Sequence, residues 1–238
     1  MANVIRIGRE QVRTGPWRGD HRVAYLAPTA QQPAPSADFI RRCLDMLAER
    51  GFSRVVTGAL SPLEQAGFLA AGFEVEERLH LLGHDLRDIP DAPADGPPMR
   101  RARRADRSEV LAVDHAAFPS FWRLDSVGLD EAVGATPRTR FRVAEPAPGS
   151  RGLSGYAICG RAGVRGYVQR LAVHPSLQGH GLGRALMVDG MQWLRRRGVQ
   201  RAMVNTQVGN DVALALYERL GFRLETVGLS VLSTGLEP

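Results

Sequence analysis

A glycine-rich loop between an apolar strand and a long helix constrains this chain more than any other feature. Residues 171–186 read LAVHPSLQGHGLGRAL. The apolar residues after the glycines recur at helical spacing, which predicts an amphipathic helix over 181–197. The free N–H groups of a helix's first turn attract anions, and glycine lets a ligand approach the backbone closely. The loop therefore predicts a pyrophosphate site, although a turn that packs a helix against a sheet would also explain the glycines.

Two common nucleotide-binding loops do not match this segment. A dinucleotide-binding loop needs GxGxxG with an acidic residue about 20 positions later, and a P-loop needs GK followed by Ser or Thr. The chain has Gly179-His180-Gly181-Leu182-Gly183-Arg184 instead.

Helices and strands alternate around this segment. Strands are expected at 99–102, 139–145, 152–160, 165–173 and 201–206, and one or two more at 222–235; helices are expected at 106–117, 126–134, 181–197 and 210–220. The carboxylate of Asp106 is expected to cap the first helix, and Gly221 to close the last one. This order predicts an α/β layered fold with a mixed central sheet flanked by helices.

The chain divides into two related halves. Residues 83–98 are rich in Pro, Asp and Gly, which is typical of an exposed linker, so we expect domains at 1–95 and 96–238. Residues 50–82 and 197–229 share one order: Arg-Gly, an apolar strand, a short helix that ends at Gly-Phe, and another strand. The halves therefore resemble diverged copies of one unit.

The C-terminal half resembles the GNAT superfamily of acyl-CoA N-acyltransferases. The family pattern has Arg or Gln, two variable residues, Gly, one variable residue, then Gly or Ala, and the chain reads Gln178-Gly179-His180-Gly181-Leu182-Gly183. The resemblance continues over about 60 residues, through the strand before His174-Pro175 and then Asn210 and LYERLGF at 216–222. It implies a GNAT-type sheet, with a smaller and degenerate GNAT-like domain before it.

The resemblance also implies roles for named residues. The backbone of Leu171, Ala172 and Val173 would pair with the pantetheine arm of acetyl-CoA, and the loop Gln178, Gly179, His180, Gly181, Leu182, Gly183 and Arg184 would hold the pyrophosphate. Asn210 would bind the arm or cap its helix, and Tyr217 would protonate the departing thiolate. A tyrosine that only packs in its helix is the alternative. No metal is expected.

The general base is not identified by this resemblance. Ribosomal-protein alanine N-acetyltransferases, small members of the family, carry a Glu on the strand that corresponds to 203–206, where this chain has Asn205. Asp114, His115, Asp125 and Glu145 are candidates, and each is also explained as a surface or capping residue. Because an α-amine has a pKa near 8 and a Lys side chain near 10.4, we expect low-pKa amines to react best.

The N-terminal half lacks two parts of the expected site. It has no glycine loop, and Phe68 stands four residues before Gly72, where Tyr217 stands four before Gly221. The mycothiol synthases resemble this two-unit plan, although 238 residues are too few for two complete units. We therefore expect one cofactor site per chain.

Composition narrows the classes of partner. The net charge is +6, but all 31 basic residues are Arg and none is Lys, which indicates codon bias rather than selection for nucleic acid. Cys43 and Cys159 are far apart and are expected in the core. No apolar run approaches the length that spans a bilayer, and the first residues lack the apolar centre of a signal peptide, so we expect no export. We expect a cytoplasmic enzyme that acetylates a small-molecule amine or a peptide N-terminus; a non-catalytic acyl-CoA sensor and a nucleic-acid binder are the alternatives.

Overall fold

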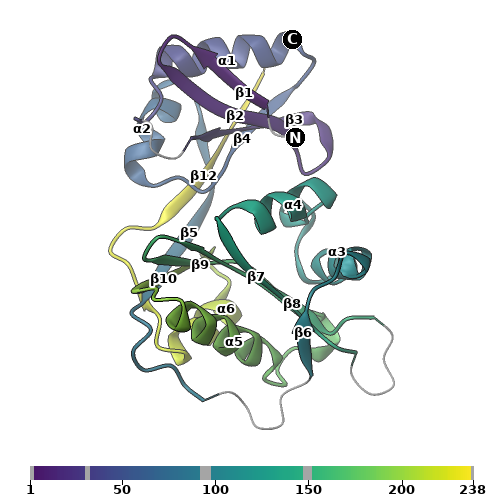
Figure 1. The fold of residues 1–238 in the computed structure, drawn as a ribbon. Coiled ribbons are helices and arrows are strands. Elements are labelled where there is room, and N and C mark those ends of the chain that lie inside the picture. Colours follow the sequence, from purple (N-terminus) through teal and green to yellow (C-terminus); the bar gives the residue numbers. More distant parts are fainter. Residues whose placement is uncertain (1–2, 30–32, 92–97, 147–151, 237–238) are drawn as a thin grey trace. The chain divides into compact units, whose positions relative to one another are not determined.

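The computed structural model describes residues 3–29, 33–91, 98–146 and 152–236. Its contacts divide the chain into two compact units (Figure 1). The first unit contains Met1–Leu81, Thr206–Gly209 and Glu225–Pro238, and the second contains Leu82–Asn205 and Asn210–Leu224. The expected boundary between 95 and 96 lies outside the described residues, and the division by contacts falls elsewhere, inside a strand.

The first unit is a mixed sheet that includes the last strand of the chain. Its strands are β1 (Asn3–Ile7), β2 (Glu10–Trp17), β3 (Asp20–Pro28), β4 (Arg54–Thr57), β5 (Glu74–His84) and β12 (Leu229–Gly235). Strand β12 pairs with β4 on one side and with β5 on the other. A segment made last therefore completes a sheet that begins with the first residues.

Two helices cover the core of the first unit. They are α1 (Ala37–Glu49) and α2 (Pro62–Ala70), and they share one apolar cluster with strand residues such as Val55 and Leu232. Helix α2 approaches the residues before α1 closely, because a Cβ on Gly67 of α2 would lie 2.0 Å from the Pro35 carbonyl oxygen. Cys43 is free and buried in this cluster, as its sequence predicted.

The second unit is a sheet with helices on both faces. Its strands are β6 (Met99–Arg101), β7 (Arg138–Ala144), β8 (Gly155–Ala162), β9 (Arg165–Val173), β10 (Arg201–Gln207, of which Thr206 and Gln207 belong to the first unit) and β11 (Arg223–Leu224). Its helices are α3 (Arg107–Ala117), α4 (Ser126–Gly134), α5 (Leu182–Arg196) and α6 (Asp211–Arg219), with short 3₁₀ turns at Arg104–Asp106, Ser120–Trp122 and Pro175–Leu177.

Alternate residues of β8 separate the two faces of this sheet. Tyr156 and Ile158 join a cluster with α3 and α4, while Ala157 and Cys159 join clusters with α5. Successive side chains of a strand point to opposite faces, so α3 and α4 cover one face and α5 the other, with α6 beside it. The expected α/β layered fold is confirmed, with every predicted helix and strand of this half present within a few residues.

The two units repeat one core topology. Strands β1 to β4 pair antiparallel, antiparallel and parallel, and so do β7 to β10. Gly72 and Gly221 both have positive φ, and the next N–H donates to the carbonyl five residues back, in Phe68 and in Tyr217. Among the described residues, the first unit has no counterparts of α3 and α4. The described part of the first unit thus matches the second unit from its first antiparallel strand pair onward.

The segment 83–91 differs from an exposed linker. Strand β5 continues to His84, and both His84 and Leu86 are buried in the core of the second unit. The His84 Nδ1 accepts a hydrogen bond of 2.7 Å from the Leu86 N–H. Residues 92–97 of the expected linker lie outside the described residues.

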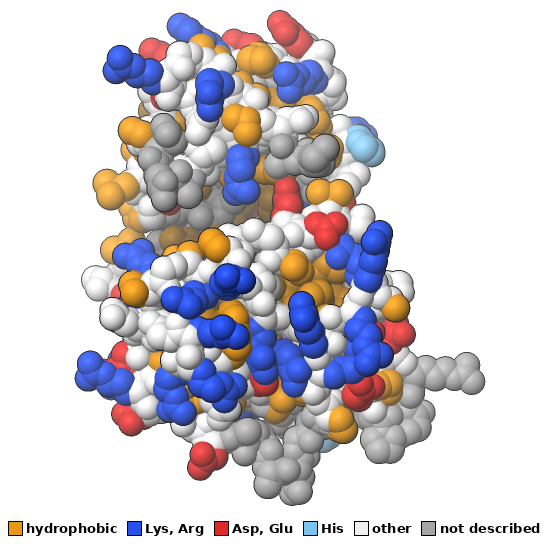
Figure 2. Space-filling view, in the orientation of Figure 1, with side chains coloured by type: hydrophobic (Ala, Val, Ile, Leu, Met, Phe, Trp, Pro, Cys, Tyr) orange, Lys and Arg blue, Asp and Glu red, His pale blue; other side chains and the backbone are white. Residues whose placement is uncertain are grey.

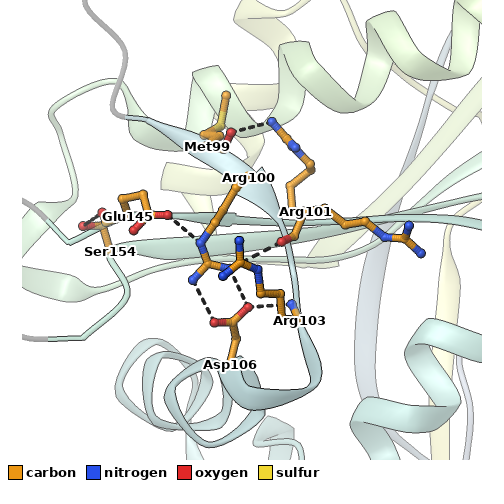
Figure 3. Close-up of polar contacts among 8 residues, drawn as sticks. Met99, Arg100, Arg101, Arg103, Asp106, Glu145 and Ser154 are labelled. Carbon is orange, nitrogen blue, oxygen red and sulfur yellow. Dashed lines mark hydrogen bonds and ion pairs between the residues drawn. The ribbon is translucent and has the colours of Figure 1, made fainter.

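Asp106 does not form the helix cap that the sequence predicted, because its carboxylate binds an arginine instead. The Asp106 side chain does not cap α3; it binds Arg100 through two hydrogen bonds of 2.6 and 2.8 Å and accepts from the Arg103 N–H (Figure 3). Arg100 also donates to Glu145 over 2.5 Å. These bonds lower the pKa of Asp106 and fasten the edge strand β6 to β7 and to the turn before α3.

Candidate functional site

Two neighbouring strands of the second unit separate and leave a backbone edge open. Strands β9 and β10 pair in parallel at only three positions, Arg165 to Tyr167 against Arg201 to Met203. Strand β9 continues to Val173 without a strand neighbour on that side among the described residues. On its other side it stays paired with β8 to its end. An open edge of this kind offers unpaired N–H and C=O groups to an extended ligand.

The register decides which groups face the open side. The His174 N–H donates to the Ser154 carbonyl over 3.0 Å, so in an antiparallel ladder Ala172 also hydrogen-bonds toward β8. Leu171 and Val173 alternate with it and therefore face away from β8. Of the three residues expected to pair with a pantetheine arm, Leu171 and Val173 have the right orientation, and the backbone of Ala172 does not.

A bulge marks the position where the strands separate. The pairing of β8 with β9 shifts between Ile158 and Cys159, which leaves Gln169 as an extra residue. Bulges re-aim side chains and are frequent next to active sites. Sequence reasoning missed this feature, although the adjacent polar residues Gln169 and Arg170 break the alternation of an otherwise apolar strand.

The loop after β9 ends in a helix with no side-chain cap. Gly179 and Gly181 have φ of +81° and +80°, and a Cβ on either would have open space, so the glycines are needed for backbone conformation rather than for room. Gly181 is the N-cap of α5 and provides no side-chain hydrogen bond. The N–H groups of Leu182, Gly183 and Arg184 thus have no partner inside the helix, and the first turn carries no acidic residue.

Side chains of the loop hold its own backbone. Gln178 donates from Nε2 to the Val173 carbonyl over 3.1 Å, and His180 Nδ1 contacts the Gln178 carbonyl at 2.8 Å. Gln178 thus occupies one of the two carbonyls of the open edge. Its position favours a bracing role in this structure over direct contact with a phosphate.

Helix α6 packs against the first turn of α5. A Cβ on Gly183 would contact Leu216 at 3.3 Å and Val173 at 3.8 Å, so close packing explains this third glycine. Asn210 is the N-cap of α6, and its side chain accepts from the Ala213 N–H over 3.2 Å. The capping role of Asn210 is therefore confirmed.

Tyr217 on α6 is almost fully buried. It is 6% exposed, belongs to the same core cluster as Val168 and Val204, and has its ring 6.0 Å from that of Phe222. Its hydroxyl forms no hydrogen bond with a described residue, yet it is not one of the fully enclosed polar atoms that lack a partner. Burial raises the pKa of Tyr217 to about 12, so the phenol keeps its proton at physiological pH.

The four candidate bases all have structural partners. Asp114 is completely buried and accepts from Arg170, Tyr156 and the Leu124 N–H. His115 bonds the Leu124 carbonyl at 2.7 Å, Asp125 caps α4, and Glu145 binds Arg100. Asn205 is exposed at the open part of β10. Each of the four candidate bases therefore forms at least one structural bond, and none is singled out as the base by its contacts.

The surface of the second unit is rich in arginine. Figure 2 shows arginine side chains gathered over this unit, among acidic and apolar ones. With a net charge of +6, such a surface attracts anionic ligands. Within the described ranges, no three His, Cys, Asp or Glu side chains are grouped to bind a metal ion, and no helix is long and apolar enough to cross a membrane.

Comparison with known proteins identifies the family. The family model described as "Acetyltransferase (GNAT) family" matches residues 112–222. The mycothiol acetyltransferase of Rhodococcus jostii (strain RHA1) is 30% identical over 236 residues, which cover 91% of this chain and 75% of that protein. This chain belongs to the GNAT acetyltransferase family. Its mixed α/β fold, with a tandem of related units, is the fold of that family.

Other relatives match different lengths of the chain. The mycothiol acetyltransferase of Mycobacteroides abscessus is 29% identical over 83% of this chain and 69% of that protein. The one from Salinispora arenicola is 50% identical, but over 24% of this chain and only 19% of its own length. In solved structures, a tandem GNAT protein from the clavulanic acid biosynthesis pathway has a TM-score of 0.69 at 16% identity, covering 99% of this chain and 82% of that one, which supports the fold alone.

Proposed function

We propose that this chain transfers an acetyl group from acetyl-CoA to the amine of a small molecule. The observation that carries this proposal is the open edge of β9, followed by a helix whose first turn has neither a cap nor an acidic residue. Leu171 and Val173 would pair with the pantetheine arm, and the N–H groups of Leu182, Gly183 and Arg184 would bind the pyrophosphate. These residues fit such a cofactor because their unsatisfied groups are the ones it requires.

Direct transfer is the chemistry that these residues support. The neutral amine nitrogen attacks the thioester carbon, a C–N bond forms, and the C–S bond breaks with the sulfur leaving as a thiolate. The proton lost by the nitrogen passes to solvent, and the thiolate takes up one proton from solvent to give CoA. Tyr217 would relieve that negative charge, which is supported by its match to the family motif and by a raised pKa that keeps it protonated. The leaving thiolate is already an anion, so it is best stabilised by a hydroxyl that still carries its proton.

The acceptor is a low-pKa amine in this proposal. All four candidate bases, Asp114, His115, Asp125 and Glu145, form structural bonds, so in this proposal the amine reaches the site in its neutral form. The relatives named mycothiol acetyltransferase suggest a finer assignment, in which the acceptor is the unacetylated precursor of mycothiol. The missing base also favours a second candidate, a module that binds acetyl-CoA without catalysis.

Replacing Gly181 with Val tests the cofactor site. A β-branched residue at φ of +80° is strained, so the loop would change conformation and the N–H groups after it would no longer converge. We expect CoA affinity, measured by calorimetry, to fall by at least about tenfold. Gly198→Val is the matched control, because Gly198 has φ of +73° and equal room at the other end of the same helix.

Two results would contradict the proposal. Unchanged CoA affinity in a folded Gly181→Val variant would remove the cofactor assignment. Tight CoA binding without transfer of radiolabelled acetyl to the mycothiol precursor, or to a panel of α-amines, would favour the binding module. Transfer to α-amines but not to the precursor would leave the activity standing and remove only the finer assignment.

A further inference from the structure

An arginine on the central strand of the second unit is held on one edge only. The Arg170 side chain is 10% exposed, and its Nε and Nη2 donate to the two Asp114 oxygens over 2.8 and 3.0 Å. Nη2 also donates to the Trp122 carbonyl over 2.6 Å, and the guanidinium lies 3.5 Å from the Phe118 ring centroid. These contacts fix the plane of the guanidinium.

The opposite edge of this guanidinium keeps its donors. No hydrogen bond leaves Nη1 toward any residue that the structure describes, and Nη1 is not among the fully enclosed polar atoms without a partner. Because the guanidinium is planar and Asp114 binds the edge formed by Nε and Nη2, Nη1 points away from Asp114. Two fixed N–H donors are thus left on a group that is otherwise nine-tenths buried.

The position of Arg170 places these donors on the side where an acceptor can approach. Arg170 lies between the bulge at Gln169 and the open edge at Leu171. Its side chain extends to the face covered by α3 and by the connection from α3 to α4. The other face is closed by the apolar core under α5, which includes Leu182 and Leu186. An amine that reaches the thioester must therefore come from the Arg170 side.

The charge of the pair determines which oxygen fits. Asp114 is completely buried and neutralises Arg170, so Nη1 is a directed donor within a pair of zero net charge. Such a donor has little net charge with which to attract an anion. Its fixed direction instead favours a neutral oxygen that lies in line with the N–H bond.

We propose that Nη1 of Arg170 binds a neutral oxygen, an amide carbonyl or a hydroxyl, beside the attacking amine of the acceptor, and so determines acceptor specificity. This inference rests on the proposed acetyltransferase function. It assigns Arg170 to substrate recognition, which differs from a role in the fold alone.

Two amines that differ in this oxygen test the inference. Glycinamide carries an amide carbonyl next to its amine, and ethylamine does not. For each amine, kcat/KM of the wild-type chain is divided by that of Arg170→Lys, so the amines' own pKa values cancel. We expect the ratio for glycinamide to exceed that for ethylamine by about tenfold or more, since a hydrogen bond from a charged donor is lost. Arg140→Lys is the matched control, because Arg140 binds Asp189 through the same two-pronged geometry away from Arg170.

A second variant changes the preference between a neutral and an anionic acceptor without removing the arginine. Asp114→Asn leaves Arg170 with an uncompensated charge, so glycine, which has a carboxylate, should gain on glycinamide as an acceptor. Equal ratios for the two amines in Arg170→Lys would overturn the inference. If that variant does not fold, the absence of a gain for glycine in Asp114→Asn would overturn it instead. Failure of the wild-type chain to acetylate these amines, the panel of α-amines and the mycothiol precursor alike would overturn the proposed function and this inference with it.

Discussion

The environment of Tyr217 matches the role of a hydrogen-bond donor to the leaving sulfur. Its ring packs in the core beside Phe222, which fixes its direction, while its hydroxyl has no partner among the described residues. Burial raises the pKa of this hydroxyl to about 12. A phenol with so high a pKa donates a hydrogen bond readily but gives up its proton only to a strongly basic anion. We therefore expect Tyr217 to stabilise the thiolate mainly while the C–S bond breaks.

Removing this hydroxyl should affect catalysis more than binding. In Tyr217→Phe we expect kcat to fall by about 10- to 1,000-fold, the range of one positioned acid, with CoA affinity unchanged. The wild-type rate should rise with pH through the titration of the acceptor amine and show no fall up to pH 10, because burial raises the pKa of Tyr217 to about 12 and keeps it protonated in this range. Initial rates from pH 6 to 10, and calorimetry with CoA, measure both. Full kcat in the variant, when chemistry limits the rate, would leave Tyr217 a packing residue.

Single residues were predicted well where a local motif defines them. The start of a helix directly after the glycine loop and the cap at Asn210 agree with the sequence because each depends on neighbours within a few positions. Arg170 was not identified, because Asp114 lies 56 residues away and no local pattern joins the two. Asp106 was assigned to the wrong partner for a different reason: Arg100 is near in sequence, but it binds Asp106 across a turn that helical spacing does not describe.

At the scale of elements, the N-termini of two equivalent helices explain the difference between the halves. Helix α5 begins at Gly181 without a side-chain cap. Helix α1, its counterpart, begins at Ser36, whose side chain accepts from the Phe39 N–H, and the Glu10 carboxylate accepts from the Ser36 N–H over 2.6 Å. An internal carboxylate thus lies at this end of α1, where a phosphate would bind at α5. All four residues of β4 also pair with β3, so these strands do not separate.

These elements predict one acetyl-CoA per chain. Titration calorimetry of the intact protein should give a stoichiometry of one, and Gly181→Val should remove that single event. Glu10→Gln should leave both the stoichiometry and the affinity unchanged, because its helix is not expected to bind cofactor. A stoichiometry of two in the wild-type chain would show that the first unit has kept a working site.

The sequence predicted the helices and strands themselves, but it did not always predict which strands pair with each other. Helical spacing defined α5 to within a residue or two, and glycines marked the ends of α5 and α6. The final strand was also expected, but its place between β4 and β5 was not, since pairing between residues such as Thr234 and Val55 leaves no local trace. Long-range pairing is determined by the whole sheet and not by a window of sequence.

At the scale of the molecule, the first unit depends on β12. Leu232 is fully buried in its core, and the Leu232 N–H donates to the Thr57 hydroxyl over 2.9 Å. Residues 3–81 therefore form an incomplete sheet without β12, with the edges of β4 and β5 unpaired. Unpaired edges of this kind promote aggregation.

Weakening β12 should destabilise the first unit. Leu232→Ala should lower its unfolding free energy by about 2–5 kcal/mol, through lost burial and a cavity. Hydrogen exchange followed by mass spectrometry should show faster exchange in β1 to β4. Thr234→Ala is the control, because Thr234 is only half-buried and its hydroxyl donates to the adjacent Gly235 carbonyl. Equal exchange in the two variants would mean that the sheet is stable without the packing of Leu232.

The place of β12 also sets an order of events during synthesis. The ribosome makes about 145 residues between the end of β5 and the start of β12, which takes roughly 7 to 30 s at ordinary rates of elongation. The second unit's β6 to β9 and α3 to α5 emerge within that interval. The first unit, whose strands β1 to β5 are translated before the second unit, is therefore completed after it. During those seconds its unpaired strand edges are exposed, and we expect chaperones to bind them.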